Sequence, residues 1–422
     1  MYDVLNAYLE NGLKIVLHKV PEAKTISCGL WVKQGSTYET DENNGLSHLT
    51  EHLLINPENE RKPRYQEMMK KVASEGVIYN AATTKEYTCF YYTGLGNTLE
   101  SCLNCLAFIA KENKEFSEEF FENEKRVVLQ EATGFYSSFQ QIKERTSQAI
   151  WGNTGTGKII MGNMQNIAHA TQEQIKEIVE EAYVPENAAI AVIGNIDYET
   201  VLSIIEDKFS DWKDKKRRIR KEIVESMPGI YFNKGNGQSS VISVGFQGPA
   251  YCSASRPLVD IAVRILGMSN MDSRMMKEIR VKRGLSYNLG GFSSFYGKRG
   301  TVGFMAVCDK EKSLEVAKVI IEVLNTAKIK GFLEEEIERE KRIMETSLLL
   351  SVENITEHLR NIGKCSVMES NFFVENEVRY IRNIQKEDVE RELKMWLKES
   401  NVGLAVIGDC NIDKLSNAIV VG

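Results

Sequence analysis

The residues most suited to chemistry lie in the motif His48-Leu-Thr-Glu51-His52, which contains two of the five histidines of this 422-residue chain. On a helix, residues three and four positions apart lie on one face, so both imidazoles and the carboxylate would point the same way. Neutral imidazoles at this spacing can share one zinc ion, and the glutamate stands one step aside, where it can accept a proton from water. The order H-x-x-E-H is the reverse of the zinc-binding order H-E-x-x-H. We therefore predict that His48 and His52 are zinc ligands and that Glu51 is a general base. The alternative is that the two histidines only fill a helix face.

A catalytic zinc site needs a third protein ligand and an open position. The other histidines are poorly placed in the sequence, and His18 belongs to a strand that resembles an edge strand. A carboxylate is the better third ligand, and a helix predicted over 117–136 carries Glu124 and Glu131, two turns apart on one face. Spacing alone does not choose between these two glutamates.

Two further motifs are weaker. The segment from Gly152 to Lys158 nearly matches the phosphate-binding pattern G-x-x-x-x-G-K-[ST], but Ile159 stands where a magnesium-binding hydroxyl is required. A helical pattern, and not a strand, precedes it, so we interpret it as a surface loop between helices. The spacing of Cys102 and Cys105 is suggestive, but no second pair accompanies it. We expect the eight cysteines to be mainly buried free thiols.

Composition places the chain among ordinary globular proteins of about two domains, with 42% apolar and 27% charged residues. The net charge of −6 argues against a nucleic-acid partner. No apolar run is long enough to cross a bilayer, and the N-terminus lacks the features of a signal peptide. It is instead typical of two strands joined at Asn11-Gly12. We expect a cytoplasmic protein with no membrane association.

The chain also shows signs of an internal duplication. Segment 187–194 (NAAIAVIG) is matched by segment 401–408 (NVGLAVIG), and Gly35 by Gly248, with offsets of 214 and 213 residues. We predict two similar halves, 1–212 and 227–422, joined by a basic linker over 213–226.

Strands alternate with long helices in both halves. Segment 77–95 is typical of two strands or one interrupted strand, and helical patterns follow over 97–113 and 117–136. This alternation indicates an α+β or α/β class.

Five segments of the chain resemble a known family. They are HLTEH (48–52), NAATTKEYT (80–88), ENEKRVVLQE (122–131), LGMSNMDSRMMKEIRVKRGLSY (266–287) and the two strands that end in VIG. Together they resemble the pitrilysin-type (inverzincin, M16-family) zinc metallopeptidases, and specifically the short, single-chain bacterial branch related to the mitochondrial processing peptidase. The resemblance implies an α+β fold of two homologous halves, each a mixed β-sheet covered by helices.

The resemblance also implies roles for particular residues in the first half. Glu131 corresponds to the third zinc ligand, and Glu124 to a carboxylate in the shell around the ligands. Asn80 and Ala81 correspond to an edge strand that binds an extended peptide by backbone pairing. The segment equivalent to His48 in the second half reads DIAVRILG and has no histidine, so one Zn²⁺ per chain is expected.

In the second half, Arg280 and Tyr287 match an arginine and a tyrosine that reach a catalytic zinc, where they could stabilise a developing oxyanion. In short-chain members of the family two chains pair to enclose a chamber, so these two residues act on the partner's zinc. We expect a homodimer, or a heterodimer with a related chain, that acts on peptide substrates.

Two departures from the family pattern concern the substrate and the subunit type. LINPENERKP follows the motif where a Phe-Lys-Gly-Thr-like run is common, which changes the local substrate wall. MSNMDSR replaces the glycine-rich loop of the non-catalytic mitochondrial subunit. The sequence thus predicts a zinc-dependent endopeptidase, and the alternative is a non-catalytic partner or peptide-binding subunit of a related complex.

Overall fold

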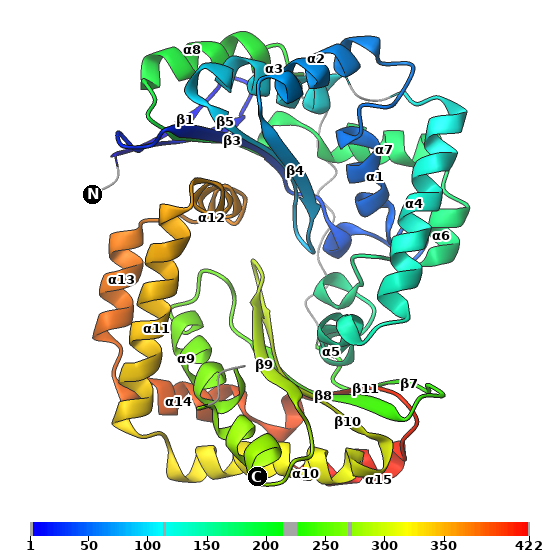
Figure 1. The fold of residues 1–422 in the computed structure, drawn as a ribbon, viewed down its shortest axis with the longest axis vertical. Helices are drawn as coiled ribbons and strands as arrows, with labels where there is room; N and C mark the ends of the chain where they lie inside the picture. The colour runs from blue at the N-terminus through cyan, green and yellow to red at the C-terminus, as the bar shows by residue number, and fades with distance from the viewer. Residues whose placement is uncertain (1–2, 113–114, 214–225, 269–271, 421–422) are drawn as a thin grey trace. The chain divides into compact units, whose positions relative to one another are not determined.

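The computed structural model describes residues 3–112, 115–213, 226–268 and 272–420 (Figure 1). They form two compact units, each assembled from more than one stretch of the chain. The first comprises 1–133, 160–222 and 348–377, and the second comprises 134–159, 223–347 and 378–422. The predicted basic linker lies almost wholly outside the described residues.

The first unit is built on a six-stranded mixed sheet in the order β1-β2-β6-β3-β5-β4. Its strands are β1 (Asp3–Tyr8), β2 (Lys14–Lys19), β3 (Thr25–Val32), β4 (Ile78–Thr83), β5 (Thr88–Leu95) and β6 (Ala188–Gly194). Strands β2 and β6 are parallel, and the other neighbours are antiparallel. The predicted hairpin at the N-terminus is confirmed, as is the division of 77–95 into two strands. Strand β2 lies between β1 and β6, so the prediction that His18 lies on an edge strand is wrong.

The second unit is built on a five-stranded sheet in the order β7-β11-β8-β10-β9. Its strands are β7 (Ile230–Asn233), β8 (Ser239–Gly248), β9 (Asn288–Phe295), β10 (Gly300–Asp309) and β11 (Val402–Ile407). Strands β7 and β11 are parallel and the rest are antiparallel, which repeats the pattern of the first sheet from β2 to β4. The matched sequences form equivalent strands β6 and β11, and each is followed or closed by a glycine with positive φ, Gly194 (152°) and Gly408 (135°). The sheets therefore support the duplication inferred from the sequence.

Helices cover both sheets. Those of the first unit are α1 (Leu46–Ile55), α2 (Pro63–Ser74), α3 (Leu99–Lys111), α4 (Glu118–Tyr136), α6 (Met164–Ala168), α7 (Gln172–Ala182), α8 (Tyr198–Phe209) and α12 (Ile355–Val367). Those of the second unit are α5 (Ile142–Trp151), α9 (Arg256–Gly267), α10 (Ser313–Lys330), α14 (Lys386–Trp396) and α15 (Ile412–Ala418). Helices α4, α11 (Glu334–Glu353) and α13 (Val374–Asn383) cross the boundaries between units. The helices predicted over 97–113 and 117–136 are confirmed as α3 and α4.

Alternating residues of each strand enter two different cores, because successive side chains of a strand point to opposite faces. In β6, Ile190 and Val192 join the large core under α1, α2, α3, α7 and α8. Ala189, Ala191 and Ile193 instead meet α12. Both faces of the first sheet are therefore buried at β6, which explains why this strand is apolar throughout.

One helix of each half packs on the sheet of the other half. Helix α12, from the second half of the sequence, covers β3 and β6 of the first sheet. Helix α5, from the first half, covers β8 and β11 of the second sheet. The two helices begin 213 residues apart, which is the offset of the duplication. The compact units thus differ from the contiguous halves of the sequence by this exchange of equivalent helices.

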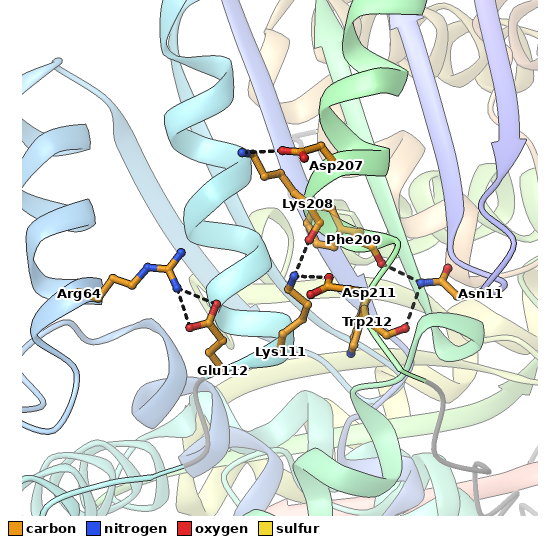
Figure 2. Close-up of polar contacts among 9 residues, drawn as sticks. All are labelled: Asn11, Arg64, Lys111, Glu112, Asp207, Lys208, Phe209, Asp211 and Trp212. Carbon is orange, nitrogen blue, oxygen red and sulfur yellow. Dashed lines mark hydrogen bonds and ion pairs between the residues drawn. The ribbon is translucent and has the colours of Figure 1, made fainter.

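Polar contacts hold the end of α8 against its neighbours (Figure 2). The side-chain amide of Asn11, in the β1–β2 turn, donates to the carbonyls of Phe209 at 2.8 Å and Trp212 at 3.1 Å. The Lys111 ammonium, at the end of α3, donates to the carbonyl of Lys208 at 2.7 Å. These bonds satisfy carbonyl groups that a helix end leaves without partners inside the helix.

Candidate metal centre

Helix α1 presents the HLTEH motif from a firmly packed position. Its leucines 46, 49, 53 and 54 are fully buried in the large core of the first unit. The helix begins after Gly45, whose φ of 105° lies in the left-handed region that favours glycine. The predicted helical arrangement of the motif is confirmed, and His48, Glu51 and His52 all lie within α1.

The two histidines converge on Glu131 of helix α4. The Nε2 atoms of His48 and His52 lie 3.6 Å and 3.5 Å from the same oxygen, Oε2 of Glu131. One potential ligand atom from each of the three residues lies within 4.8 Å of the others, and no second group of this kind occurs among the described residues. The structure therefore brings together the three side chains expected to bind zinc.

Glu124 occupies a different position, about two helical turns before Glu131 on α4. Its Oε2 faces the other ring nitrogen of His52, Nδ1, at 3.4 Å. The side-chain amide of Asn56 donates to its Oε1 at 2.8 Å. A carboxylate on the far nitrogen of a metal-binding imidazole orients the ring and fixes its tautomer. The geometry thus separates the two glutamates that spacing could not distinguish.

The donor set suits zinc. Two imidazole nitrogens and one carboxylate oxygen are a common catalytic zinc set, which also requires an open coordination position. His48 is buried, His52 is half-buried, and the Glu131 side chain is 44% exposed, so the cluster is accessible from one side.

The electrostatics of the two imidazoles differ. Burial, assisted by the neighbouring His52, lowers the pKa of His48 to about 3, so its ring is neutral near pH 7. Burial also acts to lower the pKa of His52, but Glu124, Glu131 and Glu51 outweigh it and raise that pKa overall. A cation bound at the cluster would replace the proton that these carboxylates favour on His52.

Glu51 lies beside the cluster with 8% of its surface exposed. The hydroxyl of Thr83, on β4, donates to its Oε2 at 2.6 Å. Burial raises the pKa of Glu51, and the Thr83 bond acts in the opposite direction. Sequence reasoning did not single out Thr83, although it lies two residues after Ala81, on the same face of the strand.

Asn80 and Ala81 lie on β4, the strand at one edge of the first sheet, which pairs with β5 and with no other strand of the described residues. Asn80 is exposed and Ala81 is half-buried. The Ala81 N–H donates to the side-chain oxygen of Asn80 at 2.8 Å and so is not engaged by β5. The residues predicted to bind an extended peptide therefore occupy an edge suited to strand addition, next to the strand position that holds Glu51.

Arg280 and Tyr287 belong to the second unit and are not part of this cluster. Arg280 lies in a π-helical segment, Met276–Val281, and is exposed. Tyr287 immediately precedes β9 and is 79% exposed. Short π-helical segments are rare in proteins as a whole, but those that do occur often lie at functional sites.

The glycine-rich segment 152–158 connects α5 to α6, as expected for a loop between helices. The prediction that it is a surface loop is wrong, because residues 155–159 are buried. A side chain at Gly157 would place its Cβ only 1.9 Å from the carbonyl oxygen of Gly152, so glycine is required here for close packing of the backbone.

All eight cysteines are free and six are buried, which confirms the expectation that they are mainly buried free thiols. None of the described helices combines the length and apolar character needed to cross a membrane.

Comparison with known proteins identifies related chains. The family description Insulinase (Peptidase family M16) matches residues 14–164, and Peptidase M16 inactive domain matches residues 169–344. An uncharacterized zinc protease of Bacillus subtilis is 28% identical over 84% of this chain and 86% of its own length. An uncharacterized zinc protease of Rickettsia felis is 27% identical over 90% of this chain and 92% of its own length.

Solved structures share the fold. A protease from Helicobacter pylori superposes with a TM-score of 0.87 at 18% identity, covering 97% of this chain and all of the other. A chain from complex III2 of Candida albicans superposes with a TM-score of 0.86 at 17% identity, covering 99% of both chains.

Two sheets of repeated topology, with a His-His-Glu cluster in the first unit, define a duplicated fold of the metallopeptidase type. This chain belongs to the M16 peptidase family, in its short single-chain form. The resemblance drawn from the sequence motifs and the predicted fold class are both confirmed.

Proposed function

We propose that this chain is a zinc-dependent endopeptidase that hydrolyses peptides bound in extended form along β4. The observation that carries the proposal is the convergence of His48, His52 and Glu131, with Glu51 held beside them by a strand-edge threonine. The names of the related bacterial proteins support zinc and peptide hydrolysis.

The residues of the first unit supply ligands and a base. Zinc, when bound by His48, His52 and Glu131, supplies a Lewis acid that polarises a carbonyl group and lowers the pKa of water. Glu51 takes one proton from the water that attacks the scissile carbonyl carbon and returns it to the nitrogen of the departing amine. Because burial raises its pKa, Glu51 accepts that proton more readily than an exposed carboxylate would.

The substrate would add to the free edge of β4, where backbone pairing supplies affinity with little demand on sequence. Asn80 would release the Ala81 N–H to the incoming strand. Arg280 and Tyr287 would contribute a cation and a phenol hydroxyl to the oxyanion. We propose that a second copy of the chain supplies them, and a heterodimer with a related chain is the other arrangement.

Digestion of a mixed peptide pool, followed by mass spectrometry and zinc analysis, tests the proposal. The wild type should cut peptides and hold one zinc per chain. Glu51→Gln should keep the zinc, since it removes no ligand, and lose a factor of about 10²–10⁴ in rate. Glu119→Gln, an exposed residue in the first turn of α4, is the charge-matched control and should cut normally.

Two outcomes would refute the proposal. One is cleavage by Glu51→Gln at the wild-type rate. The other is a purified wild-type chain that binds no zinc. If the wild type binds zinc but cuts nothing by itself, the chain acts with a different subunit. The complete set of ligands, base, arginine and tyrosine supports the self-sufficient enzyme over a non-catalytic subunit.

A further inference from the structure

Helix α1 is capped by a residue outside it. The carboxylate of Glu39, in the segment between β3 and α1, accepts the Gly45 N–H at 2.9 Å and the Ser47 N–H at 2.7 Å. The side-chain amide of Asn44 donates to it at 2.8 Å. Gly45 is the N-cap position and has no side chain for this purpose. Glu39 thus satisfies N–H groups that the start of a helix leaves unpaired.

The Glu39 carboxylate is buried, with 6% of the residue exposed. No lysine, arginine or histidine among the described residues forms an ion pair with it, so its partners are the amides at the helix start. The positive end of the α1 dipole favours a negative charge at this place. Burial raises the pKa of Glu39, and the hydrogen bonds act in the opposite direction because they stabilise the ionised form.

A second contact fixes the same turn from the other side. A Cβ added to Gly162 would lie 2.1 Å from the Cα of Gly45, so the two backbones are in direct contact. The Asn163 N–H donates to the carbonyl of Asn44 at 3.0 Å. The chain just before α1 is therefore held between the carboxylate of Glu39 and the turn that precedes α6.

Ser47, which donates to Glu39, is adjacent to His48 in the first turn of α1. A change in the direction or rotation of this turn would move the His48 ring relative to Glu131, which lies on a different helix. We infer that Glu39 is a positioning residue for the metal centre: it caps α1 and thereby sets the geometry in which His48 and His52 meet Glu131. This inference rests on the proposed zinc-binding function.

Zinc affinity, measured by competition with a chelator of known affinity, tests the inference without reference to peptidase activity. Glu39→Gln keeps the size of the side chain but places an NH₂ group where an acceptor is required. It should weaken zinc binding about tenfold, the lower end of what loss of an outer supporting group costs. In a chain that cleaves peptides, kcat should fall while KM stays near its wild-type value, because β4 is unchanged.

Asp197→Asn is the matched control. Asp197 caps α8, where its carboxylate accepts the Thr200 N–H at 2.9 Å, and α8 carries no residue of the cluster. Asparagine caps a helix about as well as aspartate, so this variant removes the charge of the cap with little loss of stability and should keep wild-type zinc affinity. Zinc affinity equal to wild type in both variants would overturn the inference.

A milder variant guards against misfolding. If Glu39→Gln yields no folded protein, Asn44→Ala removes one of the three donors to the carboxylate and should weaken zinc binding in the same direction. A folded Asn44→Ala chain with wild-type zinc affinity would then overturn the inference. Cleavage by Glu51→Gln at the wild-type rate would refute the proposed function alone, because the comparison of zinc affinities remains valid.

Discussion

Substitution of Gly363 by alanine tests the packing of α12 on the first sheet. A Cβ at this position would lie 2.2, 2.3 and 2.4 Å from three atoms of the Trp31 indole ring. Carbon atoms normally approach to about 3.5–4.0 Å, so the ring or the helix must move by more than about 1 Å. The ring is 1% exposed, and it already lies over Gly29, where a Cβ would be 2.6 Å away. It has no room to withdraw.

Two opposing contributions determine how much Gly363→Ala changes the free energy of unfolding. Overpacking of a core costs about 1–3 kcal/mol. Replacement of a helix-interior glycine by alanine returns about 1 kcal/mol of helix propensity. Gly134, in α4, supplies the control, since an added Cβ there has nothing within 4 Å. Gly134→Ala should be stabilising by about 1 kcal/mol. The free energies of unfolding of the two variants should therefore differ by about 1–3 kcal/mol, because helix propensity cancels in the comparison.

Urea denaturation followed by far-UV circular dichroism measures this difference, with thermal unfolding as a second readout. Gly363→Ala should shift the unfolding transition to lower urea concentration, and Gly134→Ala should not. If Gly363→Ala is stabilising to the same extent as Gly134→Ala, α12 does not pack on Trp31, and the exchange of helices between the halves is wrong.

Two further predictions concern the metal centre and the effect of pH. Glu124→Gln should weaken zinc binding about 10–100-fold, because it removes the charge that orients His52. The control Glu119→Gln, at an exposed position of the same helix, should keep wild-type affinity. Equal zinc affinities of the two variants in a competition with a chelator would contradict this prediction. Burial and the nearby His358 lower the pKa of His18 to about 3. His18 therefore binds a proton near pH 6.5 in the unfolded chain, whereas in the folded chain it stays neutral until the pH approaches 3. Stability should fall as the pH drops from 6.5 towards 3, by about 2 kcal/mol at pH 5 from His18 alone. His18→Gln should lose this part of the pH dependence, as urea denaturation at pH 7 and pH 5 would reveal, and an unchanged slope would exclude His18 as its source.

Much of the local structure could be predicted from the sequence because its causes are local. The hairpin at Asn11-Gly12, the helices α3 and α4, and the common face of His48, Glu51 and His52 depend on residues within a few positions of one another. The repeated segments NAAIAVIG and NVGLAVIG likewise indicated the duplication. A strand buried on both faces is apolar throughout, so the two equivalent strands kept similar sequences that can be recognised without the structure. Comparison of the two strands required no knowledge of their partners.

Other features depend on how elements meet, and the residues alone left them open. Glu124 and Glu131 share one face of α4 about 10 Å apart, and only the place where α1 crosses α4 puts Glu131 at both Nε2 atoms. The burial of 155–159 and the supporting bonds of Thr83 and Glu39 arise from contacts with other segments. The exchange of α5 and α12 joins segments more than 90 residues apart in the sequence. No local pattern distinguishes a helix that covers its own sheet from one that covers the sheet of the other half. The sequence by itself determined which side chains could bind zinc and activate water, since that depends on residue type and helical spacing. Tertiary structure decided which carboxylate faces the imidazoles and what holds them in place, since those depend on packing between elements distant in the chain.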